Sequence, residues 1–357
     1  MTLQAQTRDY SLNGPENAQA VAKGLANADW YKASIPRKRM KELMKRSDEP
    51  ATRDTLLWLG LMLVFGGLGV YFWGTWLAVP FFLAYGVLYG SGGDSRWHEC
   101  GHGTAFKTAW KNDLVYQIAS FMMMRNPAIW RWSHARHHTD TIIVGRDPEI
   151  VAMRPPKIFK ILLNFFGLVD VMQACAQMVK HASGSMTEDE KDFVPQSEWP
   201  KVYRVARIWL AIYAVTLLAC VAMNSILPAL FIGLPRLYGA WHHLLCGLTQ
   251  HAGLAEDVLD HRLNSRTVYM NPISRFIYWN MNYHIEHHMF PMVPYHALPE
   301  LHNELRADFP KPYAGFWNAY KEIVPALWRQ LRDPSYFVRR ELPSQSRPAA
   351  ADAPLAA

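Results

Sequence analysis

The sequence predicts an all-α integral membrane protein, with four transmembrane helices in two hairpins and a cytosolic helical cap that holds a histidine-rich metal site. Two observations lead to this prediction. Four apolar runs occur as two close pairs, in a chain of 357 residues of which half are apolar. Eight histidines fall in three short boxes whose spacing matches the turn of a helix.

The four apolar runs span residues 55–73, 75–93, 206–223 and 225–241. A helix needs about 20 apolar residues to cross the hydrocarbon core of a bilayer, and the first three runs meet that length. Pro235 and Arg236 interrupt the fourth. Because only Gly74 separates the first two runs and only Asn224 separates the last two, each pair is expected to form a hairpin with almost no outer loop. The apolar segment 158–179 contains polar residues and is expected to form a helix in the membrane interface.

Lysine and arginine are concentrated outside the hairpins and are absent from the two outer turns. The positive-inside rule therefore predicts that both termini and all three boxes face the cytoplasm, with a bacterial inner membrane as the location. The formal charge of +7 suits a basic surface that faces a membrane, and no nucleic-acid motif accompanies it. The expected organisation is an N-terminal cytosolic segment (1–54), a first hairpin (55–93), a second cytosolic segment (94–205), a second hairpin (206–241), a third cytosolic segment (242–341) and a disordered tail (342–357).

The three boxes read HECGH, HARHH and HIEHH, and they supply eight candidate metal ligands. On a helix, residues i, i+3 and i+4 cover an arc of roughly 100°, so each box directs two or three imidazoles toward one point. Eight nitrogens exceed the four ligands of a tetrahedral zinc ion, which favours two metal ions. The eight candidates are His98, His102, His134, His137, His138, His284, His287 and His288.

His251 is the ninth candidate ligand, because it follows the fourth apolar run at a position that matches the first box. Side chains near the boxes are candidates for orienting the ligand imidazoles through hydrogen bonds. These supporting candidates are Glu99, Asp140, Asp147, Glu286, His242 and His243. The histidines in loop-like surroundings are interpreted as non-ligands, and they are His181, His261, His296 and His302.

The first box also fits the H-E-x-x-H pattern of zinc proteases, in which Glu99 would be the general base between His98 and His102. An intramembrane zinc metalloprotease is therefore an alternative, although it leaves the other two boxes unexplained. A non-catalytic metal-binding or transport protein is a further alternative.

At these boxes the chain resembles the membrane fatty acid desaturase superfamily. HECGH, HARHH and HIEHH match its three histidine boxes in order, and the resemblance covers about residues 29–335. Residues 282–302 and the stretch IPRKRMKELMKRSD are similar to a bacterial subgroup that includes an enzyme desaturating dihydrorhizobitoxine, a compound derived from an amino acid. Some members of the superfamily hold a water ligand with an Asn four residues before the ninth histidine, where this chain has Gly247.

The resemblance implies an O2-dependent desaturase with two non-haem iron ions, which introduces a double bond into an acyl lipid or related aliphatic substrate. Zinc has no redox chemistry, so it would not support this reaction. The close alternative is a diiron hydroxylase or monooxygenase, including one that carries out oxidative N-demethylation, acting on a lipid or a small amino-acid-like substrate. Because no electron-carrier segment is recognisable in the chain, electrons are expected from an external ferredoxin, rubredoxin or cytochrome b5-like protein and its reductase.

Overall fold

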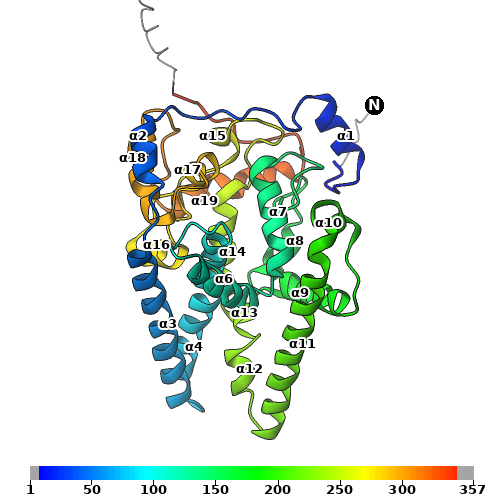
Figure 1. The fold of residues 1–357 in the computed structure, drawn as a ribbon, viewed down its shortest axis with the longest axis vertical. Coiled ribbons are helices and arrows are strands. Elements are labelled where there is room, and N and C mark those ends of the chain that lie inside the picture. The colour runs from blue at the N-terminus through cyan, green and yellow to red at the C-terminus, as the bar shows by residue number, and fades with distance from the viewer. Residues whose placement is uncertain (1–7, 344–357) are drawn as a thin grey trace, which may run out of the picture.

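The computed structural model describes residues 8–343, so nearly all of the tail expected to be disordered lies outside the described residues. The described chain is helical, as the sequence predicts. Within residues 8–343, extended pairing is limited to two isolated bridges, Thr267 with Tyr283 and Val268 with Tyr313. Figure 1 shows two long helices extending from one end of the molecule and the shorter helices gathered at the other end.

The two long helices are α3 (Asp48–Tyr71) and α11 (Trp199–Ala222), each of 24 residues. The helical stretches that contain them, Arg37–Tyr71 and Gln196–Ala222, are long and apolar enough to cross a membrane. Their apolar side chains point outward, and Leu63 and Val221 are more than three-quarters exposed (77% and 79%). Such surfaces are costly in water and are typical of helices that face lipid.

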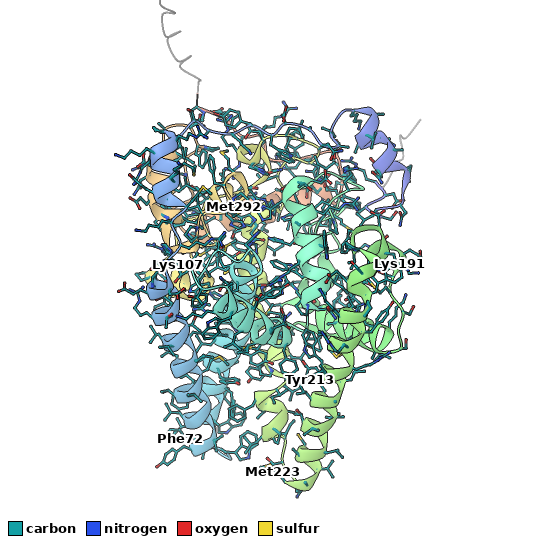
Figure 2. All side chains as sticks on the ribbon, in the orientation of Figure 1. Phe72, Lys107, Lys191, Tyr213, Met223 and Met292 are labelled. Atoms are coloured by element: carbon teal, nitrogen blue, oxygen red, sulfur yellow. The ribbon has the colours of Figure 1, made fainter. Side chains whose placement is uncertain are left out.

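Each long helix has a shorter partner beside it. α4 (Ala78–Val87) packs against α3, and α12 (Leu227–Phe231) packs against α11. Figure 2 shows Phe72 and Met223, the residues at the ends of the two long helices, at the same end of the molecule. Two helix pairs therefore end together, as the two-hairpin prediction requires, but the second member of each pair is shorter than expected.

The second apolar run does not form a separate helix that ends before the first histidine box. α4 continues through a π-helical turn, η1 (Leu88–Gly92), directly into α5 (Gly93–Gly101). A π-turn adds a residue to the helical repeat and changes the direction of the side chains that follow. Trp58 of α3 donates a hydrogen bond of 2.8 Å from Nε1 to the Leu88 carbonyl, which ties α3 to this turn. The π-helical turn therefore sets the direction in which the side chains of the first histidine box point.

The fourth apolar run differs from the prediction of one spanning helix. It divides into α12, α13 (Pro235–Tyr238) and the start of α14 (Ala240–His251). Gly233 has φ +92°, a left-handed conformation that ends the first piece, and Pro235 begins the next. The third piece starts where Gly239 meets the backbone of Gly86, because a Cβ on Gly239 would lie 2.0 Å from the Gly86 carbonyl oxygen.

The segment expected to lie flat in the interface is also two helices, α8 (Ile158–Asn164) and α9 (Leu168–Ala182), bent by 82°. Gly167 between them has φ +65°. The bent pair is apolar enough to count as one broken span or a re-entrant loop, which would raise the candidate spans from two to three.

The remaining helices form the end of the molecule that holds the histidine boxes (Figure 1). They are α1 (Pro15–Ala22), α2 (Arg37–Leu43), α6 (Ala109–Met123), α7 (Pro127–Thr139), α10 (Glu188–Phe193), α15 (His261–Asn264), α16 (Pro272–Tyr278), α17 (His284–Met289), α18 (Leu298–Leu305) and α19 (Phe316–Gln330), with 3-10 turns at Gln196–Glu198 and Tyr295–Ala297.

Candidate metal centre

Four helices bring the nine predicted ligands together. α5 carries His98 and is followed at once by His102, α7 carries the second box, α14 ends at His251, and α17 carries the third box. Figure 1 shows α7, α14 and α17 in the part of the molecule away from the free ends of the two long helices α3 and α11. Segments far apart in the chain thus supply side chains to one place.

The nine imidazoles form two groups whose ligand-type nitrogens lie within 4.8 Å of one another. The first group contains His98, His102, His134, His138 and His287, and the second contains His137, His251, His284 and His288.

The second and third boxes divide their histidines between the two groups in a complementary way. In the second box, the i and i+4 residues His134 and His138 join the first group, while His137 joins the second. In the third box, the i and i+4 residues His284 and His288 join the second group, while His287 joins the first. Residues i and i+4 share a helix face, so each pair converges on one point and the remaining histidine turns to the other.

The nitrogen positions fit a cation better than they fit a hydrogen-bond network. Nε2 of His134 lies 3.1–3.2 Å from Nε2 of His98, His102 and His138. A neutral imidazole nitrogen carries either one proton or one lone pair, so it cannot satisfy three such neighbours. Nitrogen ligands about 2.1 Å from one metal ion are separated by roughly 3.0–3.4 Å, which is close to the spacing found here.

The nitrogen atoms of the second group are spaced in a similar way. Nε2 of His284 lies 2.9 Å from Nε2 of His251 and 3.0 Å from Nε2 of His288. The two groups adjoin, because the rings of His137 and His138, which follow each other in the chain, belong to different groups. The donor set therefore suits two neighbouring metal ions that prefer imidazole, such as iron, copper, zinc or nickel.

Burial keeps these imidazoles in the form that binds metal. It lowers the pKa of eight of the nine, and repulsion between neighbouring imidazoles, were both protonated, lowers the pKa further. His137 differs, since burial alone would lower its pKa but the Asp147 carboxylate raises it above its ordinary value. Neutral imidazole is the ligand form, so the cluster needs little proton release before it can bind a cation.

Four of the histidines have a hydrogen-bond partner at Nδ1. For His288 the partner is the Thr141 hydroxyl at 3.2 Å, and for the other three it is a carboxylate or carbonyl oxygen, which sets the tautomer. Nδ1 of His137 donates to Asp147 at 2.8 Å, Nδ1 of His134 donates to Glu149 at 2.8 Å, and Nδ1 of His251 donates to the Asn264 carbonyl at 2.8 Å. A proton held on Nδ1 leaves a lone pair on Nε2, which is the nitrogen that faces the centre of each group.

Of the six supporting side chains expected from the sequence, two approach a candidate ligand. Asp147 accepts the hydrogen bond of His137, and Glu99 Oε1 lies 3.6 Å from Nδ1 of His287. The other oxygen of Glu99 accepts from the Thr104 hydroxyl and the Tyr295 backbone N–H, both at 3.2 Å. Burial raises the pKa of Glu99 to about 8.

Four of the expected supporting side chains have other partners. The two carboxylate oxygens of Asp140 accept hydrogen bonds of 3.1 Å from Nε and Nη2 of Arg146, because the turn after α7 brings that guanidinium close to the carboxylate. Glu286 points away from the cluster to Thr267 and His302. His242 contacts the Ser91 hydroxyl at 3.0 Å, and His243 contacts Asp94 at 3.2 Å. Among the described residues, none of these four forms a hydrogen bond with the nine imidazoles.

Sequence reasoning did not identify Glu149 and Asn264 as partners of the candidate ligands. Glu149 follows Asp147 by two residues, and its backbone N–H donates to Asp147 at 2.8 Å, so one turn supports both His134 and His137. The Asp-Pro-Glu run shortly after the second box was a signal available in the sequence. Asn264 acts through its backbone carbonyl, for which no side-chain pattern gives a signal.

A buried arginine and a tryptophan fix the first two helices of the site. Arg96, fully buried in α5, donates to the carbonyls of Gly92, Phe276 and Ile277, which holds α5 against α16. Trp130, one turn before His134 on α7, stacks on that imidazole with ring centres 4.2 Å apart. A Cβ on Gly101 would lie 2.0 Å from the Trp130 ring, so α5 and α7 are in close contact there.

A cavity of about 670 Å³ adjoins both histidine groups. His98 and His134 of the first group line it, as do His137, His251 and His284 of the second. Gly247 also lines it, and a side chain there would meet nothing within 4 Å. Clefts of this size hold small molecules in other proteins, so the cluster has access to a molecule bound beside it.

Comparison with known proteins gives results that agree with this geometry. A family model described as fatty acid desaturase matches residues 74–320, a range that contains all nine histidines. Two proteins of Calendula officinalis, fatty acid conjugase FAC2 B and fatty acid conjugase FAC2 A, are each 23% identical to the chain. Their alignments, over 269 and 271 residues, each cover 67% of this chain and 70% of the relative.

Proposed function

Because this chain belongs to the fatty acid desaturase family of membrane oxidoreductases, we propose that it is an O2-dependent desaturase whose nine histidines hold two iron ions. The observation that carries the proposal is the division of the histidines into two adjoining groups of five and four. Two non-haem irons, reduced by an external carrier, supply the oxidising power for removing hydrogen from an unactivated C–H bond with O2.

The residues of the chain have three tasks in this reaction. The four helices hold the imidazoles at fixed spacing before any ion binds, which lowers the cost of assembling the site. Asp147, Glu149 and the Asn264 carbonyl hold the proton of three neutral imidazoles on Nδ1, so that the lone pair lies on Nε2. Burial of the cluster excludes bulk water, and six of the nine imidazoles are buried while the other three are partly exposed.

The membrane arrangement belongs to the same proposal. The tips of the two helix pairs, at Gly74 and Asn224, carry no lysine or arginine, whereas the segments around the histidines are rich in both. By the positive-inside rule the site would face the cytoplasm, and we propose a bacterial inner membrane as its location. An external ferredoxin, rubredoxin or cytochrome b5-like protein, with its reductase, would reach the site from that side and donate electrons. Turnover of the purified chain with NAD(P)H alone would contradict the need for a carrier.

The protease alternative is disfavoured by the position of Glu99. A general base in an H-E-x-x-H site must reach a water molecule on the metal side of the two histidines. Here one oxygen of the Glu99 carboxylate accepts from Thr104 and the Tyr295 backbone, and the other lies 3.6 Å from Nδ1 of His287, whereas it is Nε2 of His287 that contacts His98. His138 and His287 would also be left without a role in a site built from His98 and His102 alone.

Metal analysis of the purified chain tests the proposal. We expect about two irons per chain, and one zinc with no iron would refute it. Mass spectrometry of products then separates the loss of two hydrogens, which a desaturase causes, from the gain of one oxygen, which a hydroxylase or N-demethylating monooxygenase causes. Fatty acyl lipids and small aliphatic acids should both be offered as substrates.

A further inference from the structure

The cavity beside the histidines has charged side chains in its lining, which an alkyl chain alone does not require. Charged side chains from several elements line it. Most of the buried ones already have a partner: two carboxylates hold His134 and His137, Glu190 contacts His181, and Arg154 pairs with Glu256 at 3.3 Å. Most of the buried charged side chains that line the cavity are thus paired within the protein. A charged side chain without a partner there needs another explanation.

Arg236 is such a side chain. It lies in α13, lines the cavity and is 2% exposed. Its Nη1 contacts the Met123 sulfur at 3.7 Å, and its buried Nε has no hydrogen-bond partner. Among residues 8–343, no carboxylate forms an ion pair with this guanidinium. Removing an unpaired charge from water is costly. Arg96 is also buried without a carboxylate, but its guanidinium donates to three backbone carbonyls and it does not line the cavity. Arg236 lines the cavity and lacks such partners among the described residues, so an anion supplied by a ligand would satisfy it.

The acids nearest to Arg236 are engaged elsewhere. Asp94 lies between Arg125 at 3.3 Å and His243 at 3.2 Å. Asp170 accepts a hydrogen bond from the Asn164 side chain at 2.7 Å. Both acids are close enough to influence Arg236 electrostatically, but neither reaches it. The lining of the cavity therefore contains the guanidinium of Arg236, which has no carboxylate partner, and a second guanidinium, that of Arg125, nearby.

We propose that Arg236 binds an anionic group, a carboxylate or a phosphate, of the molecule that is oxidised at the metal centre. This inference rests on the proposed function only in taking the cavity to be the substrate site. A guanidinium offers parallel N–H donors that match the oxygens of such a group. The polar end of the substrate would thus lie inside the protein rather than at the membrane surface.

The position of Arg236 also places a bound anionic group relative to the histidines. α13 packs against η1, the turn from which α5 starts. Asp94, which is near Arg236, precedes His98 by one helical turn, or about 6 Å along the axis. An anionic group held by Arg236 would therefore lie beside the element that leads to the first histidine box, in the same cavity that five of the nine histidines line. A short aliphatic acid or phosphate ester fits this arrangement.

Binding of matched probes to the full-length chain as purified tests the proposal. Octanoate, octyl phosphate and octanol share one alkyl chain and differ in the head group, and the fluorescence of Trp97, Trp130 and Trp209, which line the cavity, reports their binding. We expect at least one of the two anions to bind roughly tenfold or more tightly than octanol. The tighter anion distinguishes an acid from a phosphate ester. Arg236→Met should remove the preference, and Arg236→Lys should keep part of it.

Two further variants separate ligand binding from a structural role. Arg236→Met should be at least as stable to heat as the natural chain without probe, since it removes a buried charge without a partner. Arg154→Met should be less stable, because it removes one of the two guanidinium groups that pair with the buried Glu256, leaving only Arg8, yet it should retain the preference for the anion. Equal binding of all three probes by the natural chain, or an unchanged preference in Arg236→Met, would overturn the proposal. Neither result would alter the iron content, which tests the diiron proposal separately.

Discussion

Asp147 Oδ2 accepts a 2.8 Å hydrogen bond from Nδ1 of His137, and it also accepts one of 2.7 Å from the Ile142 backbone N–H. The carboxylate is fully buried and fixed at both oxygens, since Oδ1 accepts from the Glu149 backbone. It therefore holds the orientation and the proton position of one histidine of the second group. Carboxylates that act in this way on a metal-binding histidine are typically almost as important as the ligand.

Asp147→Asn is expected to weaken metal binding while the fold is kept. The amide occupies the same space, but it lacks the charge that favours a proton on Nδ1 of His137. We expect the metal affinity of the purified chain to fall by about 10- to 100-fold, measured by competition with a chelator. Asp140→Asn is the matched control, because Asp140 pairs with Arg146 and not with a histidine. Equal losses in the two variants would contradict this role of Asp147.

The two groups of histidines predict different effects for two adjacent residues. His137 belongs to the second group and His138 to the first, so alanine at each position should weaken one metal site more than the other. We expect each variant to retain about half of the metal of the natural chain. Mössbauer spectra of the iron-loaded variants should show different remaining signals. Identical spectra, or complete loss in one and no loss in the other, would show that the nine histidines do not form two sites.

The close approach of α5 and α7 at Gly101 gives a third prediction. A Cβ at this position would lie 2.0 Å from the Trp130 ring, which stacks on His134. Overpacking of this kind costs about 1–3 kcal/mol. Gly101→Ala should therefore lower the midpoint of thermal unfolding and reduce metal binding, because the displaced ring moves His134. Gly67→Ala on the exposed side of α3, where a Cβ meets nothing within 4 Å, should change neither measurement.

The nine candidate ligands could be chosen from the sequence because helical spacing is a local property. Residues i and i+4 share a face wherever a helix forms, so HECGH, HARHH and HIEHH each predict a convergent pair. The pairing of boxes into two groups could not be chosen in the same way. That His287 meets His98 while His284 meets His251 depends on how four helices cross, and no local pattern specifies the crossing.

The apolar runs show which helices can be predicted from composition and which cannot. Length and hydropathy predicted α3 and α11 well, because a helix that faces lipid needs little more than sufficient length and apolar side chains. The fourth run has the same composition, but Gly233, Pro235 and the backbone contact of Gly239 with Gly86 divide it. One consequence is the position of Arg236, which the sequence places inside a membrane run and the fold places against the cavity. The break in the run thus determines that Arg236 lies against the cavity and not within a spanning helix.

The last prediction concerns the contact between His181 of α9 and Glu190 of α10. Glu190 contacts Nε2 of His181 at 3.0 Å, and it also closes the capping box of α10 by accepting from the Thr187 backbone N–H at 2.8 Å. Burial alone would raise the pKa of Glu190, but His181 and Thr187 lower it below its ordinary value. An unfolded glutamate has a pKa of about 4.3, so this carboxylate stabilises the fold above that pH and loses its effect as the pH falls below it.

Glu190→Gln should therefore lower the stability at pH 7 and have less effect in acid. Glutamine can still close the capping box, so the variant removes chiefly the charge beside His181. We expect a loss of about 1–3 kcal/mol at neutral pH that shrinks below about pH 4, measured by unfolding across that range in detergent. Glu188→Gln on the same helix removes an exposed partner of Lys191 and should change little at any pH. A loss in Glu190→Gln that stays constant from pH 7 into acid would show that the charge is not what stabilises this contact.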